Sequence, residues 1–209
     1  MIDFYTWSTP NGYKVAIALE EMGLEYNVHP INIMKDEQFE PDFLEIAPNN
    51  KIPAIVDQDT GIKLFESGAI LIYLAEKTGK FLSTDPAKRM ATIQWLMWQM
   101  GGFGPMLGQA HYFMHFNPGV SEHAATRFRV EAERLYDVLD EQLEENEFVA
   151  DELSIADFAI LPWAARFEWH GIDLKNYENV LRWYRTMLAR DGVQAGVKVP
   201  NPDYKLPVA

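Results

Sequence analysis

Hydrophobic residues in the first 80 positions change their spacing every 10–15 residues, which is typical of short strands that alternate with helices. Short apolar runs predict four strands, over residues 2–7, 25–33, 54–57 and 62–65. Apolar positions three and four apart predict helices over residues 9–22, near 43–46 and from 66 onward. The order βαβ, α, ββα therefore predicts a small mixed sheet between helices, with a right-handed crossover.

After residue 85 the strand pattern disappears and only helical spacing remains. The predicted helices cover residues 87–116, 122–145, 154–170 and 176–189, and a proline-rich tail follows Val197. We therefore expect an α/β domain over residues 1–80, an all-α domain over residues 87–197 and a tail over residues 198–209. Residues 79–86 join the two domains.

Composition narrows the class of protein. The 209 residues are 48% hydrophobic, which is sufficient for a substantial core. They carry 18 basic and 31 acidic side chains, a net charge of −13, which argues against a nucleic-acid partner or an anionic membrane surface. Cysteine is absent, so disulfides, cysteine-ligated metals and a cysteine nucleophile are excluded. No signal-peptide pattern and no apolar run of ~18 residues is present, and we expect a cytoplasmic protein with no membrane partner.

Two predicted helix starts place polar side chains at the positive end of a helix dipole. Thr9 and Pro10 are favourable at the N-cap and at the first helical position, so they predict a helix start whatever its function. The same end of a helix lowers the pKa of a thiol bound beside it. Glu66 and Ser67 predict a second start, which is either a cap with a first-turn acid or a site for an anionic group.

The segments at residues 8–12 (STPNG), 48–55 (PNNKIPAI) and 65–70 (FESGAI) are similar to the ligand-binding segments of glutathione transferases. The run at residues 94–106 (QWLMWQMGGFGPM) resembles the nu class of that superfamily, whose members act as glutathione-dependent disulfide-bond oxidoreductases, and their fungal prion-forming relatives. The resemblance covers residues 1–189 and ends before the tail. It implies an N-terminal thioredoxin-like domain followed by a C-terminal helical bundle, which is the glutathione transferase fold.

The resemblance implies catalytic roles for Thr9 and Asn11, whose hydroxyl and amide would donate to a bound glutathione thiolate. Tyr5 is the one aromatic hydroxyl on the preceding strand, and its position inside the strand predicts that it packs. The family's cis proline falls on the Ile52-Pro53 bond. A cis bond there would turn the backbone of Ile52 outward, where an extended peptide such as glutathione could pair with it.

Further binding roles follow from the same resemblance. Glu66 would pair with the γ-glutamyl ammonium, Ser67 would hold its carboxylate, and Gln38 and Lys51 would address the glycyl end. Arg127 matches an arginine that nu-class-like proteins extend to the neighbouring subunit's glutathione, which implies a symmetric homodimer with shared sites. From the residues alone, a solvated or ion-paired surface role describes Lys51 and Arg127 equally well.

Two other motifs favour packing over chemistry. Ser154 and Asp157 have the spacing of a capping box and predict a structural helix start. His111 and His115 lie four apart on a predicted helix and could share a metal, but they have no acid at catalytic spacing. Their aromatic neighbours favour packing or one wall of a second-substrate pocket, and we expect no metal.

Disulfide exchange requires a thiolate, and a chain without cysteine must obtain every thiol from glutathione. The sequence thus predicts a glutathione-dependent disulfide reductase that takes a small-molecule disulfide. Glutathione would be its cosubstrate, as two molecules or as glutathione disulfide in each site. Two alternatives stay open: a conventional glutathione S-transferase that conjugates electrophiles, and a non-enzymatic binding module of the same fold.

Overall fold

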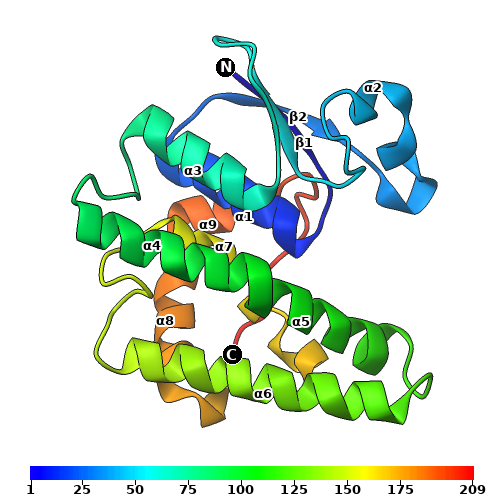
Figure 1. The fold of residues 1–209 in the computed structure, drawn as a ribbon, viewed down its shortest axis with the longest axis vertical. Helices are drawn as coiled ribbons and strands as arrows, with labels where there is room; N and C mark the ends of the chain where they lie inside the picture. Colours follow the sequence, from blue (N-terminus) through cyan, green and yellow to red (C-terminus); the bar gives the residue numbers. More distant parts are fainter. The chain divides into compact units, whose positions relative to one another are not determined.

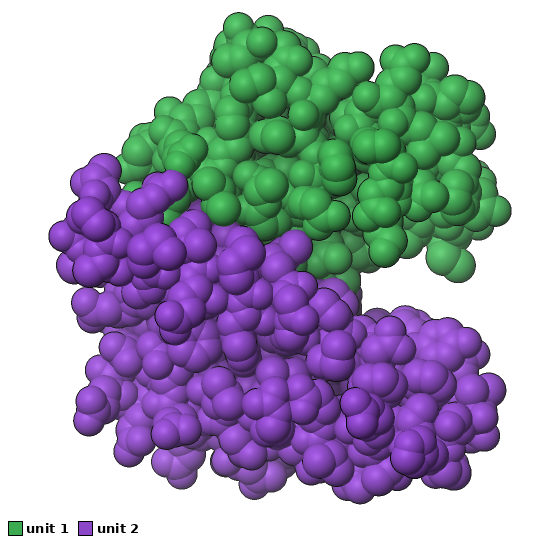
Figure 2. Space-filling model, viewed as in Figure 1, with its two compact units in different colours: residues 1–82, 189–206 green, residues 83–188, 207–209 purple.

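The computed structural model describes all 209 residues, which divide into two compact units (Figures 1 and 2). Unit 1 comprises Met1–Leu82 and Ala189–Leu206, and unit 2 comprises Ser83–Leu188 and Pro207–Ala209. This division differs from the predicted all-α domain over residues 87–197 and tail over residues 198–209, because the chain returns to unit 1 after α8. None of the helices combines the length and the apolar character needed to span a bilayer.

Unit 1 contains a four-stranded mixed sheet in the order β2-β1-β3-β4. Its strands are β1 (Ile2–Thr6), β2 (Tyr26–Pro30), β3 (Ala54–Asp57) and β4 (Lys63–Phe65). β1 pairs parallel with β2 and antiparallel with β3, and β3 pairs antiparallel with β4. All four predicted strands are confirmed, and β2 is shorter than the predicted run over residues 25–33.

The helical segments of unit 1 are α1 (Pro10–Met22), η1 (Ile33–Lys35), η2 (Glu37–Phe39), α2 (Pro41–Leu44), α3 (Ser67–Thr78) and α9 (Asp191–Gly196). The order βαβ, α, ββα is therefore confirmed. α1 ends at Gly23, whose φ of 69° lies in the left-handed region that glycine adopts at low cost. At the other end, a Cβ on Gly12 would lie 2.4 Å from the carbonyl oxygen of Trp7, so this turn requires glycine.

α9 and the segment after it pack against α1, beside which they lie in Figure 1. The backbones approach so closely that a Cβ on Gly196 would be 2.6 Å from the backbone of Ile17. The Arg190 guanidinium donates to both carboxylate oxygens of Glu21, at 2.9 and 2.7 Å. α9 thus completes the core of unit 1 over α1.

Unit 2 is all-helical, as predicted. It comprises α4 (Pro86–Trp98), η3 (Gln99–Phe103), α5 (Gly104–Ala110), η4 (His111–Phe116), α6 (Glu122–Glu144), α7 (Ile155–Ala164), η5 (Phe167–His170), η6 (Leu174–Asn176) and α8 (Glu178–Leu188). The single helix predicted over residues 87–116 contains two π-helical segments, η3 and η4. The wider turn of η3 lies between α4 and α5 and rotates the helix face from one to the other, and η4 follows α5.

The capping box predicted at Ser154 and Asp157 is confirmed at the start of α7. The Ser154 hydroxyl and backbone N–H both donate to the Asp157 carboxylate, at 3.1 and 2.9 Å. The same carboxylate accepts from the N–H of Val149 and from the indole N–H of Trp183. Every one of these groups is buried, so the motif anchors α7 in the core of unit 2.

Candidate glutathione site

The N-terminus of α1 carries the two residues predicted to be catalytic. Oγ1 of Thr9 accepts a hydrogen bond of 3.1 Å from the N–H of Gly12, and Pro10 and Asn11 form the start of the first turn. Because Oγ1 is the acceptor here, the hydroxyl proton of Thr9 points elsewhere and is available to an external acceptor. A thiolate at this end of α1 lies in the favourable field of the helix dipole.

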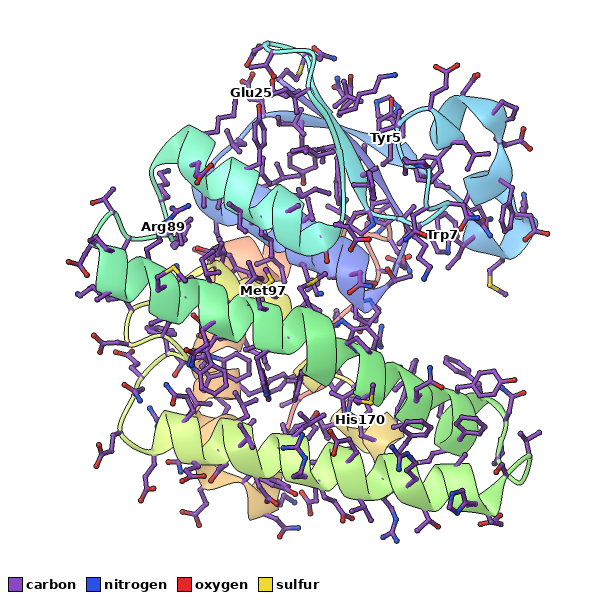
Figure 3. The ribbon with its side chains drawn as sticks, in the orientation of Figure 1. Tyr5, Trp7, Glu25, Arg89, Met97 and His170 are labelled. Carbon is purple, nitrogen blue, oxygen red and sulfur yellow. The ribbon has the colours of Figure 1, made fainter.

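Tyr5 packs inside unit 1, as predicted. Its ring stacks on His29 with 4.6 Å between centroids and lies 6.2 Å from the ring of Phe43. Figure 3 labels Tyr5, which lies on β1, and Trp7, which follows the end of that strand. Burial, together with the nearby charge of Asp3, raises the pKa of Tyr5. A phenol with a raised pKa on a packed ring is a poor activator of a thiol.

The segment before β3 presents open backbone. The Ile52-Pro53 peptide bond is cis, as the family resemblance implies, and the side chain of Ile52 packs on the small cluster that contains Phe43 and Ala47. No hydrogen bond joins the backbone N–H or C=O of Ile52 to the rest of the chain. A peptide that extends β3 at this edge could pair with both groups.

The start of α3 lacks a side-chain cap. Glu66 occupies the N-cap position with φ 70° and ψ 111°, and it makes no side-chain capping hydrogen bond. Its side chain is exposed, whereas Ser67 is buried and accepts a hydrogen bond of 3.3 Å from Nζ of Lys14 on α1. A carboxylate at this helix start would meet backbone amides, the Ser67 hydroxyl and a buried cation.

Sequence analysis missed Lys14. It occupies the third position of a run of eight buried residues, Gly12 to Leu19, and the apolar residues that follow it are the signal that could have marked it as buried.

Two residues predicted for the glycyl end also lie in unit 1. Gln38 belongs to η2, and its side-chain oxygen Oε1 is buried without a hydrogen-bond partner. An orphaned buried acceptor of this kind is costly, and a ligand N–H would satisfy it. Lys51 is exposed and makes no ion pair, so the ammonium is open to a carboxylate.

Arg127 lies in unit 2, on the first half of α6. It lines a cavity of about 490 Å³ with one residue of α5 and five others of α6: Met106, His123, Thr126, Phe128, Val130 and Glu131. Neighbouring arginines are paired, since Arg134 binds Glu131 at 2.8 Å and Arg129 binds Glu133 at 3.5 Å. Arg127 is exposed and makes no ion pair, so its guanidinium remains open for an external anion.

The histidines at positions 111 and 115 pack in unit 2, as expected. Nε2 of His111 lies 2.6 Å from Nε2 of His170, a residue that Figure 3 labels, and Nδ1 of His170 lies 3.1 Å from the hydroxyl of Tyr136. His115 stacks on Trp169 with 4.1 Å between centroids. Burial lowers the pKa of His111 to about 4, so this ring is neutral at pH 7. No group of three or more acidic or histidine side chains is arranged to hold a metal ion.

Two protein-family models match the chain. The model of the "Glutathione S-transferase, N-terminal domain" matches residues 2–76, and that of the "Glutathione S-transferase, C-terminal domain" matches residues 103–191. Disulfide-bond oxidoreductase YfcG of Escherichia coli (strain K12) is 50% identical over 196 residues, which are 91% of each chain.

Two similar solved structures contain bound ligands. A glutathione transferase from Pseudomonas putida, with one glutathione disulfide bound per subunit, is 44% identical with a TM-score of 0.91 over 96% of this chain and 92% of its own. One from Burkholderia graminis, with two glutathione molecules per subunit, is 41% identical with a TM-score of 0.90 over 96% of this chain and 88% of its own. With both domain models matched and identities of this size over nearly the whole chain, the protein belongs to the glutathione S-transferase family.

Proposed function

We propose that this protein is a glutathione-dependent disulfide-bond oxidoreductase of the nu-class type. The observation that carries the proposal is a chain without cysteine whose relative at 50% identity is named a disulfide-bond oxidoreductase. The glutathione disulfide and the paired glutathiones in the solved relatives are the oxidised product and the two reduced cosubstrates of that reaction. A cytoplasmic location, which we expect from the sequence, would supply the reduced form.

The reaction balances with thiols from glutathione alone. One glutathione thiolate attacks a sulfur of the substrate disulfide, which forms a mixed disulfide and releases the first substrate thiolate. A second glutathione thiolate attacks the glutathione sulfur of that mixed disulfide, which releases the second substrate thiolate and glutathione disulfide. Two protons from the glutathione thiols end on the two substrate thiols.

Within unit 1, the residues divide this work between activation and binding. Thr9 and Asn11 would donate to the attacking thiolate at the start of α1, where the dipole lowers its pKa. The unpaired backbone groups of Ile52, beside Pro53, would bind the cysteinyl part of the tripeptide. The γ-glutamyl and glycyl ends would then be held by four side chains: Glu66, Ser67, Gln38 and Lys51.

An assay of bis(2-hydroxyethyl) disulfide reduction by glutathione, coupled to glutathione reductase and NADPH, tests the function. We expect turnover well above the uncatalysed rate and weak conjugation of glutathione to a chloronitrobenzene. Thr9→Ala should lower disulfide turnover at least about tenfold through loss of one charge-assisted hydrogen bond, and Thr9→Ser should restore it. No turnover above background would contradict the function, and dominant conjugation would favour a conventional transferase.

We further propose that the protein is a homodimer in which Arg127 reaches the glutathione bound by the partner subunit. The unpaired guanidinium beside a cavity on α6 supports this role. Arg127→Ala should weaken glutathione binding about tenfold, as expected for a lost hydrogen bond between charged groups. The matched control is Arg129→Ala, on the same helix and paired with Glu133. Calorimetry that finds equal affinities for the two variants would remove Arg127 from the site.

A further inference from the structure

Lys14 is a buried charge-bearing residue in the core of unit 1. Its side chain is 1% exposed, and it lies on α1 between Tyr13 and Val15, which are buried as well. Burial of an ammonium is costly unless a partner compensates it. A methionine of similar length would fill the same space without that cost, so the amine at this position calls for a chemical reason.

The contact of Lys14 with α3 supplies that reason. Nζ donates to Oγ of Ser67 at 3.3 Å, and Glu66, the residue before it, is the charged group whose field favours the ammonium. Other charges on the elements packed around α1 are engaged elsewhere. Asp57 on β3 binds Lys77 of α3 at 2.8 Å, and on α1 Glu20 accepts from Tyr26 while Glu21 binds Arg190.

We propose that Lys14 is a positioning residue for the γ-glutamyl carboxylate, acting through Ser67 as a buried cation behind the start of α3. The inference rests on the proposed function, since it assumes that glutathione binds at this helix start. An ammonium can only donate, so a protonated Lys14 binds the Ser67 oxygen as an acceptor and places a positive charge behind the start of α3. A neutral amine at the same place would supply no charge to attract the carboxylate.

The protonation of Lys14 is therefore coupled to ligand binding. Burial lowers the pKa of Lys14 from its ordinary 10.5 to about 7. A carboxylate bound at Ser67 favours the ammonium and raises the pKa again. Binding above pH 7 then takes up a proton at Lys14, and the affinity falls as the pH rises from 7 to 9.

Calorimetry with S-methylglutathione tests this coupling, because that ligand has no thiol proton of its own to release. Titrations at pH 7.5 in two buffers of different ionisation enthalpy count the protons exchanged. We expect the wild type to take up a fraction of a proton and Lys14→Met to take up none. We also expect Lys14→Met to bind about tenfold or more weakly, the usual loss for one charge-assisted hydrogen bond. Lys14→Arg keeps its charge at every pH tested, so its affinity should fall less than that of wild type between pH 7 and 9, by only the part that comes from the ligand's own ammonium.

A ligand variant separates positioning from a general structural role. An S-methylglutathione analogue whose γ-glutamyl carboxylate is a carboxamide should bind wild type and Lys14→Met with similar affinity, because the group that senses the cation is gone. If Lys14→Met bound both ligands more weakly than wild type, and by the same factor for each, the inference would be overturned. The control variant is Lys80→Met, which removes another lysine of unit 1 that donates a hydrogen bond, to the Met22 carbonyl, and should leave affinity and proton uptake unchanged.

The outcomes distinguish this inference from the function on which it rests. A wild type that does not bind S-methylglutathione contradicts the proposed function itself. A wild type that binds without proton uptake, or a folded Lys14→Met that binds as tightly as wild type, overturns only the role of Lys14. If both Lys14 variants fail to fold, the wild-type proton count and the carboxamide ligand still decide the question.

Discussion

The helix starts of α7 and α3 both bury a serine and are otherwise built in opposite ways. Ser154 and Ser67 are each 3% exposed. At α7 the serine and the Asp157 carboxylate form a capping box, and the carboxylate also accepts from two groups of the core. At α3 the cap residue Glu66 makes no side-chain capping bond, and the buried serine is backed by an ammonium.

This contrast shows how one local motif serves either stability or binding. In a complete capping box, the two side chains of the box accept hydrogen bonds from backbone amides at the helix start, so these amides are paired within the protein. A start without such a box keeps its amides for an external anion, and a cation behind it strengthens that preference. Substitutions at α7 should therefore change the free energy of unfolding, and substitutions at the start of α3 should change the affinity for glutathione.

The largest effect on the free energy of unfolding is expected when the acid of the α7 capping box is removed. Asp157→Ala leaves Trp183, Val149 and Ser154 without their buried acceptor, which should lower the free energy of unfolding by about 3 kcal/mol. Urea unfolding followed by tryptophan fluorescence measures this loss, since five of the six tryptophans lie in unit 2. The control is Asp137→Ala, an exposed residue on α6. A loss below 1 kcal/mol at Asp157, within the range of a cap alone, would contradict the closed-box interpretation.

Two buried aspartates should give the two units opposite pH dependences. Burial raises the pKa of Asp157 to about 6, although its four donors oppose the rise. Asp57 is also buried, but hydrogen bonds from Lys77 and Tyr73 outweigh that burial and lower its pKa to about 2. With an ordinary value of 3.8 in the unfolded chain, Asp157 binds the extra proton in the folded state and Asp57 in the unfolded state.

Stability from Asp157 is therefore present below pH 3.8 and is lost as the pH rises through 6, by about 3 kcal/mol in all. Stability from Asp57 is present above pH 3.8 and is lost as the pH falls to 2. Urea titrations from pH 2 to 7 should show Asp157→Asn flattening the first dependence and Asp57→Asn the second. The slope with pH is the quantity to compare, because each substitution also shifts the absolute stability. Equal slopes in wild type and Asp157→Asn between pH 4 and 6 would count against a raised pKa.

The strands and helices of both units could be predicted from the sequence because their signals are local. Short apolar runs mark the strands of unit 1, helical spacing marks the helices, and the spacing of Ser154 and Asp157 marks the α7 cap. The return of the chain to unit 1 could not be predicted in this way. It depends on the fit of Gly196 against Ile17 and on the pair of Arg190 with Glu21, residues about 170 positions apart, and sequence spacing carries no trace of such contacts.

The candidate site shows the same limit. Thr9, Ile52 and Glu66 stand in short motifs that a family resemblance can identify. Lys14 stands in no such motif, and a lysine in an amphipathic helix is usually a surface residue. Its partner Ser67 is 53 positions away, so only the packing of α1 on α3 brings the ammonium to the site.

A crossed pair of serine substitutions tests the contrast with equal chemistry at both helices. Ser154→Ala should lower the free energy of unfolding by about 1–2 kcal/mol, as for a lost N-cap, and leave glutathione affinity unchanged. Ser67→Ala should weaken glutathione binding about tenfold through one lost hydrogen bond to a charged group, with a smaller change in stability. Chemical unfolding and calorimetry on both variants complete the test. The contrast fails if both serines change the same quantity.

The smallest effect is expected at Glu66, whose φ of 70° is strained for any residue with a Cβ. Glu66→Gly removes that strain and should raise the free energy of unfolding by about 0.5–1 kcal/mol. It also removes the carboxylate proposed to pair with the γ-glutamyl ammonium, so affinity should fall while stability rises. Glu66→Gln keeps the strain and should lose affinity without the gain in stability.

Asp151→Gly is the matched control for Glu66→Gly, since Asp151 has a φ of 71° in unit 2. It should gain stability with no change in glutathione affinity, because it relieves a positive φ at a residue that has no proposed role in binding. If Glu66→Gly bound glutathione as tightly as wild type, the strained backbone at the start of α3 would have no ligand to explain it. The start of α3 would then be a weak helix cap with no role in binding. It would differ from the start of α7 only in how much it stabilises the fold.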